Sequence, residues 1–329
     1  MIWVNAIKLY NSVNNSFKKK LIFHVGTGAG FYSEINGMLC AMLYCYVHKI
    51  KFILYADDAT FAGGGWSEFF MPFCSQNHDK LNHKCNVKSR YGEKKEPFYC
   101  LKRKLLKVRN GVDYLTDDIF GKACLGSYSQ EITYALWNDF GIDGDINKEF
   151  VKLRDVALRY NSKTFAQIKE KIKGIHLPAH YCSIQLRGGD KSFEVSNRMD
   201  VNCVIDRIKR MEIKIDNIFI FTDEFSYIEK IREKCPEWNI YTLTKESEHG
   251  YYNVDFQKLS WVKKRREMIK LFAMVEICIH SDLHFGCEVA CVNDYIKNIK
   301  IPEKYIAIWT EDDAGLKEEF VSQLNSQFN

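Results

Sequence analysis

The sequence predicts an α/β protein with two doubly wound domains, and three observations lead to this prediction. The chain has 329 residues, which exceeds the size at which a single hydrophobic core usually stops growing. Apolar strand-like runs alternate with amphipathic helical runs in both halves, which is typical of parallel sheets covered by helices. Glycine-rich or polar residues follow several of the strand-like runs, where such sheets bind ligands. We therefore predict an N-terminal domain over residues 1–172 and a C-terminal domain over 173–329.

The first half opens with a strand, a glycine turn, a helix and a second strand, which is the repeating unit of a parallel sheet. A long helical segment near the end of this half is interrupted near Asn161. Residues 66–130 show no clear period, and we expect helices and loops there that cover the sheet. In chain order, the predicted elements are a strand over 21–25, a helix over 35–49, a strand over 51–56 and helix over 147–175.

The second half repeats the alternation of strands and helices without repeating the sequence. Its strands are short, apolar and bounded by polar residues, and its helices have charged outer faces. In chain order, the predicted elements are strand 180–186, helix 198–213, strand 217–223, helix 224–235, strand 238–243, helix 262–277, strand 278–281 and helix 284–295.

Composition and charge narrow the class of protein. Hydrophobic residues make up 46% of the chain and charged residues 27%, and the formal net charge is +5. Neither end carries a basic arm, so nucleic acid is not an expected partner. No run approaches the ~18–20 apolar residues of a membrane span, and no signal peptide is evident. The twelve cysteines have no metal-ligand spacing. We expect a cytoplasmic protein without a bound metal.

The glycine turn in the first half reads GTGAGFYSE. Gly28 and Gly30 allow a close approach of backbone to a ligand, and the helix that follows offers N–H groups to an anion. The dinucleotide fingerprint would need a third glycine where Phe31 stands. Asp57 and Asp58 follow the next strand, where a ribose-binding acid would lie. An NAD(P)-dependent oxidoreductase and a tight turn without a ligand therefore remain alternatives.

A second candidate segment, LRGGDK, follows the first strand of the second half. Arg187 presents a planar fork that binds pairs of phosphate oxygens. Gly188 and Gly189 have no side chains that would block a ligand from Arg187. The simpler interpretation is a surface turn in which Asp190 pairs with Arg187 or with Lys191, which would contribute little to stability.

Two further strand ends carry candidate residues. Thr222 and Asp223 could bind a base or a ribose, or Asp223 could cap the next helix. Gly286 lies where we expect a helix to begin, and a helix N-terminus is a seat for phosphate. His280 and His284 suggest a metal, but no third ligand is in register with them.

The order of GAGFYSEINGML, LRGGDK, FTDE and FGCEVA resembles the GDP-fucose-dependent fucosyltransferases. That superfamily includes alpha-1,6-fucosyltransferases, bacterial nodulation fucosyltransferases and protein O-fucosyltransferases. The resemblance covers about residues 21–292. It implies the GT-B fold, in which two Rossmann-like domains face each other across a cleft, with the acceptor on the N-terminal side and the donor on the C-terminal side.

The resemblance also implies roles for single residues. Arg187 and Asp190 match the first arginine and the aspartate of the family's HxRRxD motif, and Gly188 replaces its second arginine. Both serines of an FSS-like segment are replaced as well. The residues placed at the donor by this resemblance are Gly28, Gly30, Phe31, Arg187, Thr222, Asp223, Phe285, Gly286 and Cys287.

The implied activity is an inverting, metal-independent transfer of a sugar to a hydroxyl of a glycan or protein acceptor. Fucose from GDP-fucose is the expected donor group, although the replaced motif residues also allow another GDP-sugar or a UDP-sugar. No cofactor is expected besides this donor substrate. We expect Asp190 or Glu194 to act as the general base, with Glu34 as a third candidate. A catalytically inactive protein that binds nucleotide sugars or carbohydrates is a further alternative.

Overall fold

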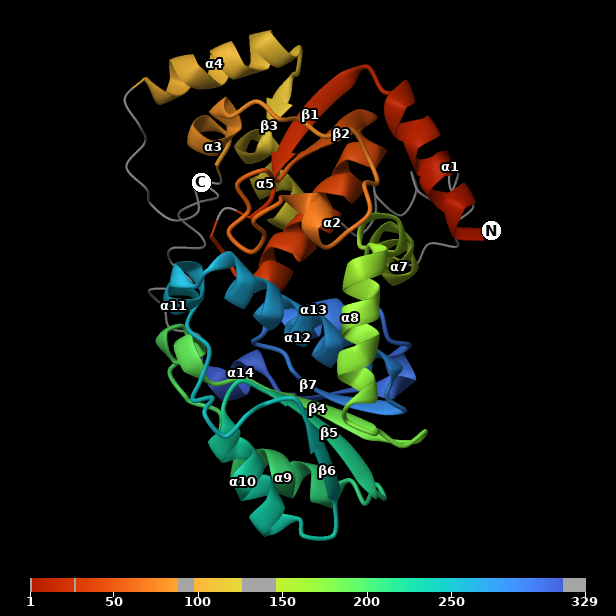
Figure 1. Ribbon diagram of the computed structural model, residues 1–329, viewed down its shortest axis with the longest axis vertical. Helices are drawn as coiled ribbons and strands as arrows, with labels where there is room; N and C mark the ends of the chain where they lie inside the picture. Colours follow the sequence, from red (N-terminus) through yellow and green to blue (C-terminus); the bar gives the residue numbers. More distant parts are fainter. Residues whose placement is uncertain (1, 27, 88–97, 126–145, 316–329) are drawn as a thin grey trace. The chain divides into compact units, whose positions relative to one another are not determined.

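The computed structural model describes residues 2–26, 28–87, 98–125 and 146–315 (Figure 1). By its internal contacts the chain divides into two compact units, with the change from unit 1 to unit 2 between Lys163 and Thr164. The boundary predicted from the sequence, between residues 172 and 173, stays a prediction. Among the described residues, no helix is both long and apolar enough to cross a membrane.

Unit 1 contains a small parallel sheet in the order β2-β1-β3. The central strand β1 is buried over its last four residues, and it pairs with β2 along its whole length and with β3 at Leu21 and Ile22. The elements of unit 1 are α1 (Ile2–Ser16), β1 (Lys19–His24), α2 (Phe31–Val47), β2 (Ile50–Tyr55), the 3-10 helix η1 (Trp66–Glu68), α3 (Leu81–Cys85), α4 (Tyr99–Asn110), β3 (Tyr114–Leu115), α5 (Thr116–Leu125) and α7 (Ile146–Ala157).

Helix α1 covers part of the outer edge of this sheet, along β2. The Asn14 side chain donates to the carbonyl oxygen of Phe52 at 3.0 Å and accepts from its N–H at 2.7 Å. Both backbone groups of an edge-strand residue are thereby paired, which removes a place where another strand could add.

Unit 2 contains a parallel sheet in the order β6-β5-β4-β7-β8. The chain moves outward from β4 in one direction and then returns to build β7 and β8 on the other side. Helices α9 and α10 cover one face and α12 and α13 the other (Figure 1). The elements are α8 (Ser162–Lys173), β4 (Cys182–Leu186), η3 (Gly189–Phe193), α9 (Val201–Arg210), β5 (Asn217–Thr222), α10 (Phe225–Lys234), β6 (Asn239–Thr242), α11 (Asn253–Lys258), α12 (Trp261–His280), β7 (Leu283–Cys287), α13 (Cys291–Lys297), η4 (Pro302–Lys304), β8 (Tyr305–Trp309) and α14 (Glu311–Ala314).

This strand order creates a topological switch point between β4 and β7. The connection after β4 leads to β5 on one side, and the connection after β7 leads to β8 on the other side. Because these connections diverge, they leave a crevice at the carboxyl edge of the sheet. Arg187 follows β4 directly, so the fold places it beside this crevice.

Several predicted elements are confirmed, and the prediction for residues 278–287 is wrong. The break near Asn161 is real, since α7 ends at Ala157 and α8 begins at Ser162. The strand predicted over 278–281 is instead the last turn of α12, and the residues predicted to begin a helix at 284 form β7. The reason is that the buried residues of α12 continue at helical spacing through Cys278.

The irregular region predicted over 66–130 contains η1, α3, α4, β3 and α5 where it is described. Part of that region, residues 88–97 and 126–130, lies outside the described residues.

Candidate functional site

A pocket of about 110 Å³ opens at the switch point of unit 2. It combines charged, aromatic and glycine residues from the segments that follow β4, β5, β6 and β7 and from the end of β8. The lining residues are Arg187, Gly188, Gly189, Lys191, Val195, Asn197, Arg198, Met199, Glu224, Tyr227, Tyr252, Val289 and Trp309.

Arg187 is held between two carboxylates in this pocket. One guanidinium nitrogen, Nη2, donates to Asp190 Oδ1 at 2.5 Å, and the other, Nη1, donates to Asp223 Oδ2. The guanidinium also lies over the Tyr251 ring, 5.1 Å from its centroid. Because the side chain is only 18% exposed, these contacts fix its position before any ligand binds.

The two aspartates are themselves anchored by backbone N–H groups. Asp223 accepts from Gly188 N at 2.7 Å and from Tyr251 N at 2.9 Å. Asp190 accepts from Asn253 N at 2.9 Å. The sequence-predicted residues Arg187, Asp190 and Asp223 therefore lie together, in a network that joins the segments after β4, β5 and β6.

The backbone at Gly189 requires glycine. Its φ is +57°, and a Cβ atom there would lie 2.2 Å from the carbonyl oxygen of Tyr251. The close approach lets Asp190 N donate to that same carbonyl at 2.9 Å. Gly189, the second glycine of LRGGDK, thus allows the loop after β4 to contact the loop that contains Tyr251.

Arg198 is the cation of the pocket that sequence reasoning missed. Lys191 is already paired, with its Nζ 2.5 Å from Glu194 Oε2. In the described part of the chain, no carboxylate forms an ion pair with Arg198, which is exposed at the pocket wall. Burial and the charge of Glu224 raise the pKa of Tyr227, and Arg198 lowers it in part, so Arg198 acts on this wall electrostatically. Its sequence context carries no motif that would have marked it.

Comparisons with known proteins were made by sequence and by structure. By sequence, no protein-family model and no curated protein matches the chain. By structure, it is similar to fucosyltransferase NodZ from Bradyrhizobium, with a TM-score of 0.51 and 12% identity over 86% of this chain and 93% of NodZ. An alpha-1,6-fucosyltransferase NodZ structure co-crystallized with GDP gives the same TM-score and identity.

A plant protein gives the same result. The chain is similar to a mutant of Arabidopsis thaliana FUT1 in complex with GDP, with a TM-score of 0.50 and 12% identity over 90% of this chain and 72% of the plant protein. Similarity at this identity establishes the fold. The chain has the GT-B fold.

The α/β fold class predicted from the sequence is therefore confirmed, with a parallel sheet in each of two units. In this GT-B chain, Thr222 is buried and accepts from Glu224 N at 3.1 Å. The N-cap of α10 is Glu224, whose side chain accepts from Ser226 N. The alternative in which Asp223 caps this helix is thus wrong, and Asp223 binds Arg187 instead.

The FSS-like segment lies inside the GT-B sheet. Phe285 and Cys287 are fully buried in β7, and a Cβ atom on Gly286 would lie 2.2 Å from the Tyr305 hydroxyl. The helix N-terminus expected at Gly286 lies instead at α13, which begins at Cys291. Contact of these three residues with a donor stays a prediction.

The glycine turn of the GT-B chain lies in unit 1. The Glu34 carboxylate is buried and accepts from Gly26 N and Ala29 N at 3.3 Å each. Gly26 has a φ of +91°, whereas the Cβ direction of Gly30 points into open space. Phe31 is buried with its ring 4.9 Å from that of Phe61. Gly28 also lies in this turn, and Glu34 serves to fix the turn's shape.

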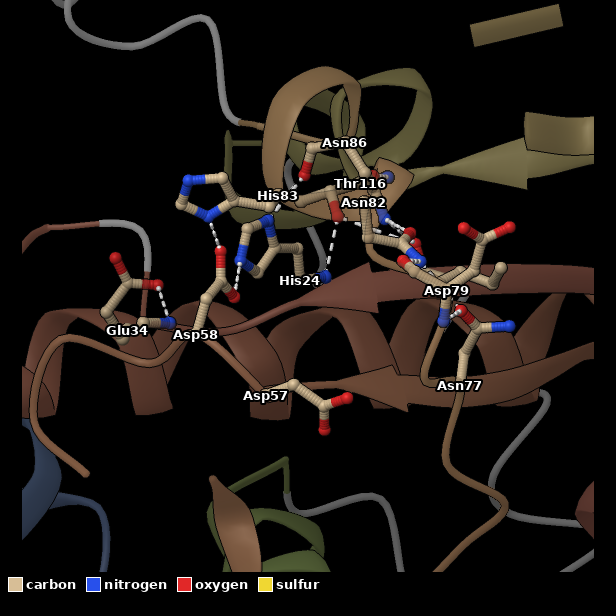
Figure 2. A network of polar contacts seen from close by, with 12 residues as sticks. His24, Glu34, Asp57, Asp58, Asn77, Asp79, Asn82, His83, Asn86 and Thr116 are labelled. Atoms are coloured by element: carbon tan, nitrogen blue, oxygen red, sulfur yellow. Dashed lines mark hydrogen bonds and ion pairs between the residues drawn. The ribbon is translucent and has the colours of Figure 1, made fainter. Parts of the chain in front are cut away.

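A second polar cluster lies at the carboxyl edge of the sheet of unit 1, and Figure 2 shows its side chains. His24 Nε2 lies 2.8 Å from Asp58 Oδ1, and His83 Nδ1 bonds to Asp58 Oδ2. Asp57 points away from this pair (Figure 2). Across the described residues, no three His, Cys, Asp or Glu side chains are arranged to hold a metal ion.

Proposed function

We propose that this chain is an inverting glycosyltransferase that moves a sugar, with fucose from GDP-fucose as the first candidate, to a hydroxyl of a glycan or protein. The observation that carries the proposal is the guanidinium of Arg187, fixed by Asp190 and Asp223 at the switch point of unit 2. The fold likeness supports it, since NodZ and plant FUT1 structures of the same fold contain GDP.

The proposed reaction needs positive charge at the donor's diphosphate. The acceptor oxygen forms a bond to the anomeric carbon, the carbon–oxygen bond to the diphosphate breaks, and its electron pair leaves with the nucleoside diphosphate. Fixed cations and N–H groups stabilise the charge that develops there. This chemistry requires no metal ion if the protein supplies that charge.

Arg187 does not supply all of this charge, because two carboxylates offset it. Lys191 is likewise offset by Glu194. Arg198 is the lining cation without an ion pair among the described residues, and we propose that it takes the place of the second arginine that Gly188 replaces. Tyr227, Tyr252 and Trp309 line the same pocket and offer surfaces for a nucleoside or a sugar.

The two carboxylates predicted as the general base already have partners. Asp190 binds Arg187 with one oxygen and Asn253 N with the other. Glu194 is ion-paired with Lys191 and about a third exposed, at 36%. Each stays a candidate, and each would have to release a partner in order to take a proton.

The proposal is tested first by ligand binding. We expect GDP and GDP-fucose to raise the melting temperature, and the panel also contains UDP, UDP-sugars and NAD. Stabilisation by UDP-sugars alone would change the donor. Stabilisation by NAD alone would favour an oxidoreductase. A nucleotide sugar that binds but is never turned over would indicate an inactive binding protein.

A matched pair of variants tests the role of Arg198. Arg198→Ala removes a charge-assisted contact and should weaken GDP binding by about 10-fold or more. Arg210→Ala is the control, because Arg210 is an exposed arginine in the last turn of α9. Isothermal titration at fixed salt measures both affinities. Equal affinities would remove Arg198 from the donor site.

A further inference from the structure

Helix α4 carries apolar side chains on two opposite faces. Its inner face packs on unit 1, where Tyr99 and Leu106 are buried in a cluster with Val112 and Leu115. In Figure 1, α4 lies at the outside of unit 1, and it packs on α3 and β3. Burial on the inner face therefore accounts for the position of α4, and the apolar residues of its outer face need another explanation.

The outer face carries a row of exposed apolar side chains, which we call the α4 stripe. Its members are Phe98, Leu101, Leu105 and Val108, and spacings of three and four residues place them along one side of the helix. Leu101 is 64% exposed, Leu105 54% and Val108 81%. Single exposed apolar residues are ordinary on a protein surface, whereas a contiguous row indicates an interaction surface.

Helix α4 is also strongly basic. Its charged residues, none of them acidic, are Lys102, Arg103, Lys104, Lys107 and Arg109. Arg103 and Lys107 pair with Asp118, at 2.6 Å and 2.9 Å. Lys107 also lies in the last turn, where a cation complements the helix dipole. These two cations therefore have a structural role within unit 1.

Two other cations border the α4 stripe. Lys104 comes three residues after Leu101 and four before Val108, so it lies beside the stripe. Among the described residues, no carboxylate forms an ion pair with Lys104. Arg109 Nε lies 3.2 Å from Asp79 Oδ2, but the side chain of Arg109 is still 64% exposed. The outer face thus combines an apolar row with positive charge that is open to solvent.

The size and charge of this face favour a lipid surface over a protein as its partner. A specific protein interface buries about 800 Å² on each partner, and four side chains on a helix of 12 residues offer only part of that area. A lipid surface needs no complementary shape. Apolar side chains enter the boundary between headgroups and acyl chains, and the cations beside them reach the lipid phosphates.

We propose that α4 attaches this protein to the surface of an anionic lipid bilayer. The α4 stripe enters the boundary between headgroups and acyl chains, while Lys104 and Arg109 contact lipid phosphates. The helix lies along the surface and does not cross the bilayer. This attachment involves unit 1 alone, and it does not depend on the transfer of a sugar.

The chain offers a matched control for the α4 stripe. Leu9 in α1 is 58% exposed, close to the 54% of Leu105. Both leucines lie in helices of unit 1. The charged residue of α1 is Lys8, and the helix carries no basic residue in its last turn. The two leucines therefore differ mainly in the row and the charges that surround them.

The test is co-sedimentation of the full chain with lipid vesicles. At low salt we expect binding to vesicles of phosphatidylcholine mixed with phosphatidylglycerol, binding about 10-fold weaker or less to phosphatidylcholine alone, and a loss of binding as salt is added. Leu105→Ala should weaken binding by about 10-fold, and Lys104→Ala by about 5-fold. Leu9→Ala should bind like the wild type. Because alanine favours helix, urea denaturation should show that all three variants are folded.

The outcomes decide between a lipid surface and a protein partner. A folded wild type that does not bind the anionic vesicles at low salt would overturn the proposal. Binding that Leu105→Ala and the double variant Leu101→Ala with Val108→Ala leave unchanged would do so too. A dimer in light scattering that Leu105→Ala dissociates, without vesicle binding, would assign the stripe to a second copy of this chain instead.

The same measurements separate this proposal from the proposed function. Vesicle binding by a protein that turns over no sugar nucleotide would support the attachment and would count against the transfer. Turnover of GDP-fucose without vesicle binding would do the reverse.

Discussion

His284 shows how burial decides the chemistry of a single histidine. Its Nε2 donates to Asn293 Oδ1 at 2.9 Å, and its Nδ1 accepts from Ser183 Oγ at 2.7 Å. Burial lowers the pKa of His284 to about 4, with the Asn293 bond acting in the opposite direction. The ring is therefore neutral at pH 7 and joins β7 to β4 and α13.

Acid should unfold the protein partly through this group. Below pH 6.5 the unfolded chain binds a proton at His284, while the folded chain does not until about pH 4. The free energy of unfolding should therefore fall by about 3 kcal/mol across this window. Urea denaturation at pH 7 and at pH 4.5 measures the change. A His284→Gln variant should lose less stability between these two pH values, and an equal loss would refute the assignment.

At the scale of elements, the loop between β4 and α9 depends on one backbone conformation. Gly189 and Gly111 have nearly the same φ, +57° and +58°, but only Gly189 has backbone atoms of another loop at its Cβ position. Alanine at either place is strained by its φ. Only at Gly189 does it also push Tyr251 away.

Two substitutions separate these effects. Gly111→Ala should cost about 1 kcal/mol of unfolding free energy, which is the conformational term alone. Gly189→Ala should cost more and should also weaken GDP binding, because the loop that holds Asp190 must shift. Equal stability losses and unchanged GDP affinity would show that the loop contact is not required. Chemical denaturation and titration calorimetry provide both readouts.

The elements also show what the sequence could and could not predict. The strand before Arg187 was predictable because a buried apolar run ends abruptly in a cation. The end of α12 was not predictable, because Cys278 and Ile279 are apolar residues that would also suit a buried strand. Only their packing in the folded protein shows that they belong to the helix. No sequence motif marks Arg198 or the cluster at Asp58. Residues that are far apart in the sequence form such a cluster, as His24 and Asp58 do across 34 positions.

At the scale of the whole molecule, each unit has its own sheet and its own buried core, as the two-domain prediction requires. Length and the alternation of strands and helices were enough to predict this. The place where one unit ends is harder, because α8 looks like a solvated helix in sequence. In the structure its Thr164 and Ile168 are buried, and Gln167 accepts from Arg265 Nη2 at 2.8 Å.

Two fragments test that boundary. A chain from residue 162 to 323 keeps α8, and we expect it to unfold cooperatively. A chain from 174 to 323 loses the burial of Ile168 and should be less stable by about 2–5 kcal/mol. Thermal and urea denaturation compare them. Equal stabilities would favour the boundary predicted from the sequence, after residue 172.

The side chain of Asp223 has a consequence for how this protein can diversify. Its two oxygens receive Arg187, Gly188 N and Tyr251 N, so one carboxylate fastens two loops to the strand that carries it. A substitution at Asp223 would therefore disrupt the contacts of Arg187, Gly188 and Tyr251 together. The side chains of Tyr227 and Tyr252 line the same pocket but make none of these contacts. Substitutions at Tyr227 and Tyr252 can therefore change ligand preference during evolution while the contacts of Asp223 are kept.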